Sequence, residues 1–358
     1  MQRAPLQTPV YRTEAFSMMK HTDAEIQKLF EQKTVSNLAI KVGIGNRIVY
    51  EKYVSDGGVD ENTLFDMASV TKVMATTQIA LYALDRGQIF LEDPVSKYFS
   101  CSGEKRNITV FHLLTHTLGI GYKLLCSPGT TYGNVAEKIL SIPQDIPVGS
   151  DVRYSCPGFI LLGKILETVY GAGLNDLFRK LVALPVGLDD TTFLPDRKKK
   201  IVNANTDDAL RGEVNDCNCR FLGGVAGNAG IFSNMKDMTR FVKYLLRHGA
   251  GVMSEKTFAL ATKNLTPGMS ESRGLGFLYV DKKYDQTGTL FPDGSIGHCG
   301  HTGQSVFLSP SSGLYVIVLS DATKCTVEKY GSEVYHEVTD MRKRLHTAIK
   351  ADLTGMLR

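Results

Sequence analysis

The feature that most constrains the fold is the return of strand-like sequence after a long helical stretch. Near the start, apolar segments at residues 38–44 and 48–54 flank Gly45-Asn46, a pair typical of a hairpin turn. Helical patterns dominate residues 66–225, and strand-like segments recur from about residue 228. We therefore expect an α+β fold with one antiparallel sheet built from both ends of the chain.

A mainly helical region is expected to interrupt this sheet. A capping box at Thr22 and Glu25 marks the first predicted helix. We predict a sheet domain of residues 1–65 plus 228–358, flanked by N- and C-terminal helices, and a mainly helical domain of residues 66–227. The predicted helices are 22–33, 70–84, 108–116, 133–141, 157–170, 174–182, 236–247 and 332–350, and the later predicted strands are 230–233, 275–281, 295–299, 305–308 and 314–319.

Composition excludes several classes of protein. Of the 358 residues, 43% are hydrophobic and 22% charged, which suits a large buried core. A net charge of +4 without a dense basic patch argues against nucleic-acid binding, and no apolar run is long enough to span a membrane. The seven cysteines fit no zinc motif, so we expect reduced thiols in a cytoplasmic protein. The N-terminus lacks the apolar segment of a signal peptide; a trimmed leader would instead make the protein periplasmic or secreted.

Ser69 and Lys72 are the first candidate catalytic residues. Side chains three residues apart on a helix share one face, so a helix beginning near Ser69 would place the Lys72 amine beside the Ser69 hydroxyl. A serine nucleophile needs such a neighbouring base, and a helix N-terminus favours developing negative charge. Taken alone, the Ser-x-x-Lys spacing also arises by chance in many chains.

Tyr154 is the second candidate, because Tyr154-Ser155-Cys156 precedes an apolar helix. A tyrosine there commonly serves in packing or in a surface hydrogen bond. A nearby lysine ammonium would lower the phenol pKa, so Tyr154 could take the Ser69 proton and return it to a leaving group.

Residues 297–305, Gly-His-Cys-Gly-His-Thr-Gly-Gln-Ser, form the third candidate segment. Its glycines allow close backbone approach to a ligand, and a strand edge of this kind can offer an N–H to an oxyanion. His298 and His301 could instead be ordinary strand histidines. A metal site is not expected, because no further ligand lies nearby in a suitable spacing.

In this order, the three motifs resemble those of the class C β-lactamase-related serine hydrolases, which include esterases and D-amino-acid peptidases. Residues 65–72 with 91–95, 113–119 and 223–233 are also similar to family signatures, so the resemblance covers roughly residues 36–320. It implies the β-lactamase/transpeptidase-like, penicillin-recognising fold.

The resemblance also implies roles for individual residues. Ser69 would be the acylated nucleophile, Lys72 would lower the pKa of Tyr154, and Tyr154 would be the general base and then the acid. The backbone N–H groups of Ser69 and His301 would form the oxyanion hole. The overlapping triplet His301-Thr302-Gly303 also fits the Lys-Thr-Gly motif, but the run Gly-His-x-Gly-x-Thr-Gly resembles the hydrolase branch of the family and places His298 at the position of the lysine. The residues expected to contact the oxyanion or the substrate are Ser69, Cys156, His298, Gly300 and His301.

Several residues depart from the family pattern. Cys156 stands where an amide or carboxylate is usual, and a thiol neither holds a substrate amide well nor anchors Lys72 by charge. His298 removes a permanent positive charge, which disfavours substrates bearing a carboxylate. Leu118 replaces a small serine, and Asn215 and Asn228 stand where the most similar branch has histidines.

We therefore expect a serine hydrolase that acts through an acyl-enzyme on a small ester or amide, with esterase-like activity favoured. One alternative is a β-lactamase or D-amino-acid peptidase, and another is a catalytically silent binding module of the same fold. This chemistry needs no cofactor and no metal. No nucleic-acid or membrane partner is expected, and the sequence leaves the oligomeric state open.

Overall fold

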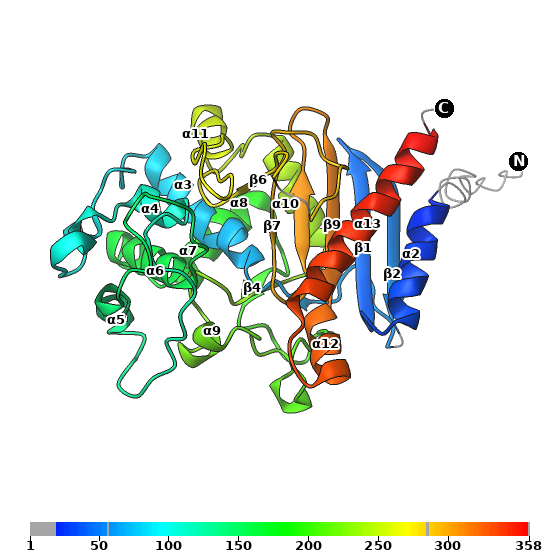
Figure 1. The fold of residues 1–358 in the computed structure, drawn as a ribbon, viewed down its shortest axis with the longest axis horizontal. Coiled ribbons are helices and arrows are strands. Elements are labelled where there is room, and N and C mark those ends of the chain that lie inside the picture. The colour runs from blue at the N-terminus through cyan, green and yellow to red at the C-terminus, as the bar shows by residue number, and fades with distance from the viewer. Residues whose placement is uncertain (1–18, 56, 284–285, 357–358) are drawn as a thin grey trace, which may run out of the picture.

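A six-stranded antiparallel sheet is built from both ends of the chain, as predicted (Figure 1). The computed structural model describes residues 19–55, 57–283 and 286–356, so the N-terminal segment behind the localisation prediction lies outside the described residues. The strand order is β2-β1-β9-β8-β7-β6. The strands are β1 (Asn37–Ile44), β2 (Arg47–Ser55), β6 (Leu278–Tyr279), β7 (Ile296–Cys299), β8 (Ser305–Leu308) and β9 (Leu314–Ser320).

Side chains alternate between two cores, as the period of a strand requires. On β1, Ile40 packs in a core shared with the terminal helices α2 (Lys20–Glu31) and α13 (Tyr335–Met356), which also contact each other. Its neighbour Ala39 lies in the larger core on the opposite face, shared with α10 (Met235–Leu246) and the helical region. The sheet is therefore buried on both faces, and its end with β7 and β6 borders the helical region (Figure 1).

The helical region surrounds α6 (Cys156–Tyr170), an apolar helix that Ser155 caps at its start and Gly171 ends in the left-handed conformation. A second sheet of order β3-β5-β4 lies near this region. The remaining elements are β3 (Phe65–Asp66), β4 (Thr192–Phe193), β5 (Ile231–Ser233), α3 (Thr77–Asp85), α4 (Val110–Leu114), α5 (Val135–Ser141), α7 (Leu174–Phe178), α8 (Leu184–Val186), α9 (Cys217–Phe221), α11 (Glu255–Ala261), α12 (Ala322–Tyr330), the π-helical turns η1 (Lys72–Thr76) and η4 (Arg179–Ala183), and the 3₁₀ turns η2 (Val95–Lys97), η3 (Gly103–Asn107) and η5 (Asp208–Leu210).

The fold class is confirmed, and some local predictions are wrong. The first helix begins at Lys20, with Met19 as an N-cap that makes no side-chain hydrogen bond, and Thr22 lies inside the helix, where its hydroxyl donates to Asp352. The strand predicted at residues 275–281 shortens to β6, and α12 and the three-stranded sheet were not predicted. The two-domain division stays a prediction. Within the described residues, no helix is both long and apolar enough to cross a membrane.

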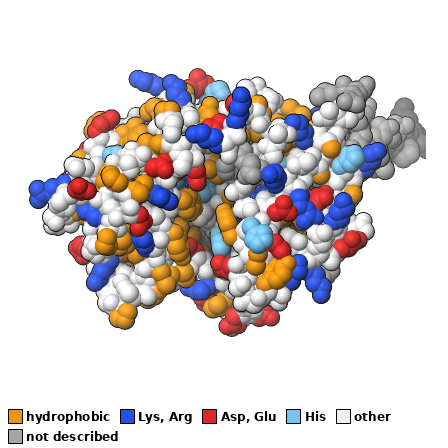
Figure 2. Space-filling view, viewed as in Figure 1, with side chains coloured by type: hydrophobic (Ala, Val, Ile, Leu, Met, Phe, Trp, Pro, Cys, Tyr) orange, Lys and Arg blue, Asp and Glu red, His pale blue; other side chains and the backbone are white. Residues whose placement is uncertain are grey.

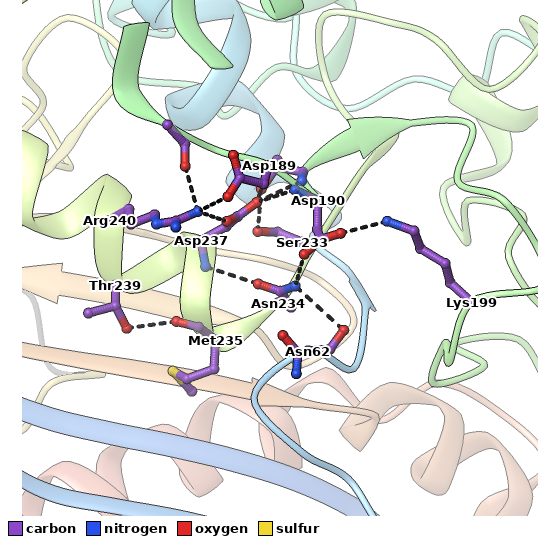
Figure 3. A network of polar contacts seen from close by, with 12 residues as sticks. Asn62, Asp189, Asp190, Lys199, Ser233, Asn234, Met235, Asp237, Thr239 and Arg240 are labelled. Atoms are coloured by element: carbon purple, nitrogen blue, oxygen red, sulfur yellow. Dashed lines mark hydrogen bonds and ion pairs between the residues drawn. The ribbon is translucent and has the colours of Figure 1, made fainter. Parts of the chain in front are cut away.

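The junction between β5, α10 and the loop before β4 is fixed by the buried carboxylate of Asp237 (Figure 3). One Asp237 oxygen accepts from the backbone N–H groups of Asp190 and Thr191, at 2.7 and 2.8 Å, and from the Thr191 hydroxyl at 2.9 Å. The other oxygen accepts from Arg240 at 3.2 Å. Three donors and a cation therefore depend on one side chain.

Replacing Asp237 with alanine should lower the free energy of unfolding by about 3 kcal/mol, because buried donors lose their acceptor. Urea unfolding followed by circular dichroism measures this loss. The matched control is Asp189→Ala, which removes the exposed partner of the same Arg240 and should cost under about 1 kcal/mol. Equal losses in the two variants would contradict the role assigned to Asp237.

Candidate active site

Ser69 lies on a strained turn between β3 and the helix that follows. Ala68 has a φ of +44°, a conformation unusual for a residue with a side chain. The Asp66 carboxylate holds this turn by accepting the Ala68 N–H at 2.8 Å. Burial, only partly opposed by hydrogen bonds from the Asn215 and Ala68 amides, raises the pKa of Asp66 to about 6. The turn therefore presents Ser69 at the start of the helix, where the sequence predicted it.

Lys72 is completely buried in the π-helical turn η1, directly below Ser69. Its Nζ donates to Ser69 Oγ at 3.0 Å, to the Asn228 carbonyl at 2.9 Å and to Cys156 Sγ at 3.5 Å. Burial acts to lower the Lys72 pKa, but interactions with Cys156 and Tyr154 oppose it, and the pKa lies above its usual value. Three acceptors surround Nζ, which suits an ammonium with its three N–H donors.

Tyr154 lies beside this ammonium, with its ring centroid 4.9 Å from Lys72 Nζ and 4.7 Å from the centroid of the His116 ring. Burial raises the pKa of Tyr154, while Lys72 and a hydrogen bond with Ser69 lower it. Burial is the larger effect, so the pKa lies above its usual value. Lys72 lowers the Tyr154 pKa, as predicted, but burial raises it by more. The predicted net lowering is therefore wrong, and the resting side chain is a phenol.

Cys156 begins α6 and is buried against Lys72. Burial raises the pKa of its thiol, against the opposing effect of Lys72, so Cys156 is uncharged. Besides Ser69 Oγ, the oxygen acceptor of Lys72 is the carbonyl of Asn228, whose side-chain amide donates to Asp216 at 3.1 Å. The sequence marked Asn228 only as a departure from histidine, and Asp216 was not singled out.

His298 lies on β7, next to the two residues that pair with the edge strand β6. Its Nδ1 is 2.8 Å from the Cys299 carbonyl, which can only accept, so Nδ1 carries the proton. Burial, together with the positive charges of Arg273 and Lys72, holds the His298 pKa well below its usual value. His298 is therefore neutral, and its Nε2 is a buried acceptor that receives no hydrogen bond from the described residues.

The turn after β7 is fastened to the residues just before Ser69. The Asp66 carbonyl accepts from Thr302 Oγ1 at 3.0 Å and from Gln304 Nε2 at 2.9 Å. A Cβ added to Gly300 would lie 2.7 Å from the Met67 carbonyl, so only glycine allows this approach. The predicted segments at residues 66–72 and 297–305, far apart in the chain, are thereby brought together.

Two backbone N–H groups at this junction are free. Neither the Ser69 N–H nor the His301 N–H donates to any described residue. The His301 side chain turns to the rim, where Nε2 lies 3.1 Å from Glu333 Oε2 and the ring stacks on Tyr335. A pair of unpaired donors beside a buried serine is the arrangement that an oxyanion requires.

A cleft with two arms opens at Ser69, and the face drawn in Figure 2 is hollowed between the helical region and the start of α13. Ser69, Tyr122, Tyr154 and His301 border both arms, whose volumes are about 590 and 550 Å³. The first arm also contains Cys156, Asn215, Asp216 and Arg220, and the second contains Glu271, Arg273, Gln286 and His298.

Arg273 places a permanent positive charge in the second arm, where none was predicted from the sequence. Its side chain is 4% exposed, and Nε and Nη2 donate to one oxygen of Glu271. Its Nη1 has no partner among the described residues, and its guanidinium carbon lies 5.6 Å from the Tyr154 ring centroid. Sequence reasoning missed Arg273, which lies outside the recognised motifs. In the described ranges, no cluster of three or more His, Cys, Asp or Glu side chains is arranged to bind a metal.

The fold and the site define a protein of the β-lactamase/transpeptidase-like fold with a serine–lysine–tyrosine cluster. The model of the Beta-lactamase family matches residues 22–335, and the chain belongs to this family. It is 27% identical to Esterase EstB of Burkholderia gladioli, over 90% of this chain and 95% of that protein. It is 29% identical to the "Putative D-alanyl-D-alanine carboxypeptidase" of Escherichia coli (strain K12), over 77% and 76% of the two chains.

Solved structures share the fold at lower sequence identity. EstCE1, described as a hydrolase with promiscuous acyltransferase activity, aligns with a TM-score of 0.72 at 20% identity, over 94% of this chain and all (100%) of that chain. The octameric penicillin-binding protein homologue from Pyrococcus abyssi aligns with a TM-score of 0.69 at 18% identity, over 87% and 77% of the two chains. Together with the family match, they confirm the predicted fold.

Proposed function

We propose that the protein is a serine hydrolase that forms an acyl-enzyme on Ser69, with a small ester as its preferred substrate. The observation that carries this proposal is the contact of 3.0 Å between Lys72 Nζ and Ser69 Oγ, buried at the meeting point of the two cleft arms. The similarity to Esterase EstB over nearly the whole of both chains supports an ester rather than an amide.

In this mechanism, Tyr154 in its phenolate form takes the proton of Ser69 Oγ while Lys72 remains an ammonium. Ser69 Oγ attacks the ester carbonyl carbon, and the N–H groups of Ser69 and His301 stabilise the resulting oxyanion. Tyr154 then protonates the leaving alcohol as the ester C–O bond breaks. In the second half, Tyr154 takes a proton from water, the hydroxide adds to the acyl carbon, and the acid leaves as Ser69 regains its proton.

The remaining predicted site residues would shape substrate binding. Gly300 lets the turn after β7 approach the nucleophile, and the neutral His298 offers an acceptor to a substrate N–H or O–H. Cys156 lines the other arm as an uncharged thiol, beside the polar side chains of Asn215, Asp216 and Arg220.

A second candidate function is cleavage of a carboxylate-bearing substrate, as in a D-amino-acid peptidase or a β-lactamase. The unpartnered Nη1 of the buried Arg273 favours it, because a guanidinium in a cavity is a strong carboxylate ligand. The similarity to the Escherichia coli protein named for carboxypeptidase activity is in keeping with this alternative. A catalytically silent module is the third possibility, and turnover measurements separate it from the other two.

We also propose a cytoplasmic location, supported by seven cysteines that form no disulfide.

Incubation with a fluorophosphonate probe should add one label, at Ser69, because the activated hydroxyl attacks phosphorus as it would an ester carbonyl. Mass spectrometry of the intact protein and of its peptides measures the label, with Ser69→Ala as the control. Absence of a label on folded protein, or equal labelling of Ser69→Ala, would reject the serine hydrolase. A label without turnover of p-nitrophenyl esters would favour the silent module.

The kcat/KM for an ester should rise about tenfold per pH unit between pH 6 and 9. Burial places the pKa of Tyr154 above its usual value, so the active phenolate is scarce at neutral pH and accumulates as the pH rises. Lys72 is expected to keep its proton over this range, because Ser69, Cys156 and the Asn228 carbonyl all accept hydrogen bonds from its ammonium. Tyr154→Phe should lose about 10²–10⁴ in rate together with this slope. A rate that falls above pH 7, or a slope that survives in Tyr154→Phe, would contradict Tyr154 as the base.

Arg273→Gln should lower kcat/KM about 10- to 100-fold for an ester with a terminal carboxylate, because a charge-assisted hydrogen bond is lost. The same ester with a terminal carboxamide should change little. The matched control is Arg220→Gln, which removes an arginine from the other arm. Equal effects on the two esters would argue against carboxylate recognition by Arg273.

A further inference from the structure

Arg342 lies on α13, outside every motif recognised in the sequence, and its side chain is completely buried. Its Nη2 donates to the Gly300 carbonyl oxygen, and its Nη1 donates to Gln286 Oε1 at 3.1 Å. Among the described residues that line the two cleft arms, Gln286 is present and Arg342 is not. Arg342 therefore does not line the cleft; it contacts the site indirectly, through the backbone of the turn after β7.

The carbonyl that Arg342 binds belongs to the same peptide unit as the His301 N–H. In a planar trans peptide, the C=O and the N–H point in opposite directions. The guanidinium therefore lies on one side of this unit, and the free His301 N–H is directed to the other side. On the Ser69 side, Gly300 lies so close to the Met67 carbonyl that no side chain would fit. The Gly300 N–H is also committed, to the Gln304 carbonyl at 2.8 Å.

We propose that Arg342 is a positioning residue for hydrolysis, which holds the Gly300–His301 peptide in place and polarises it toward the oxyanion. This inference rests on the serine hydrolase proposed above. A charged donor on the carbonyl draws electron density through the amide, so the His301 N–H becomes a stronger donor, and the effect is large in a buried, low-dielectric site. Arg342 also donates to a buried carbonyl, and rotation of the peptide would leave that carbonyl without a hydrogen bond.

The test compares Arg342→Gln and Arg342→Lys with Arg344→Gln. Arg344 lies on the same helix, but it pairs with Glu25 at 2.6 Å on the side away from the site. Rates on a p-nitrophenyl ester are expressed per active site, with the active sites counted by the fluorophosphonate probe. Affinity for a boronic acid, which forms an anionic tetrahedral adduct with serine, reports on the oxyanion hole alone.

Arg342→Gln should lower kcat about 10- to 100-fold, with KM within about twofold and boronate affinity reduced by the same factor as kcat. Arg342→Lys keeps the charge with fewer directed donors and should lose less. Arg344→Gln should match the wild type. If Arg342→Gln does not fold, the comparison between Arg342→Lys and Arg344→Gln decides.

A second readout does not depend on turnover. The chain has eight histidines, so selective ¹⁵N-histidine labelling gives few amide signals, and the His301 signal is identified by His301→Gln. Loss of the guanidinium should move the His301 amide proton upfield, while Arg344→Gln leaves it in place.

The failures of the two proposals differ. An unlabelled, inactive wild type rejects the serine hydrolase and this inference with it. A labelled, active wild type rejects the inference alone if the Arg342 variants keep kcat per active site, boronate affinity and the His301 amide position. If the Arg342 variants lose activity only because fewer molecules are folded or labelled by the probe, Arg342 has a purely structural role. That result also rejects the positioning role.

Discussion

The buried ammonium of Lys72 is the interaction on which the rest of the site depends. A charge taken out of water costs several kcal/mol unless hydrogen-bonding partners surround it. Here the partners are Ser69 from the same helix, Cys156 at the start of α6, and the carbonyl of Asn228 in the loop before β5. The folded chain must bring these three segments to one point to satisfy Lys72. The position of the nucleophile thus follows from the stability of the fold.

The second constraint joins the sheet to this cluster. Because Thr302 and Gln304 both donate to the Asp66 carbonyl, the edge of the six-stranded sheet cannot move independently of the turn that carries Ser69. Asp66 therefore serves both sides: its carboxylate holds the strained Ala68, and its carbonyl holds the turn after β7. The two free N–H groups remain in register because one residue connects their segments.

The sequence predicted what depends on local spacing, and missed what depends on long-range contact. Helical periodicity placed Lys72 beneath Ser69, and hydrophobic alternation with turn residues located β1, β2, β8 and β9. The capping box failed because Thr22 lies inside the helix, where its hydroxyl donates to Asp352, which lies 330 residues away along the chain. Arg273 and Arg342 have no local signature at all. Their importance comes from what they touch, which only the folded chain reveals.

The effect of Cys156 follows from the charges around Lys72 more directly than from its departure from the motif at residues 154–156. Among the ion pairs of the described residues, none joins a carboxylate to Lys72; Asp216 acts on it from a longer distance, and Asn228 links the two by hydrogen bonds. With a neutral thiol at position 156, the positive charge of Lys72 is less compensated before reaction. The negative charge that the reaction needs, first on the Tyr154 phenolate and then on the oxyanion, would relieve this imbalance. An uncharged residue at this position therefore favours the transition state over the resting site, which is the difference that catalysis requires.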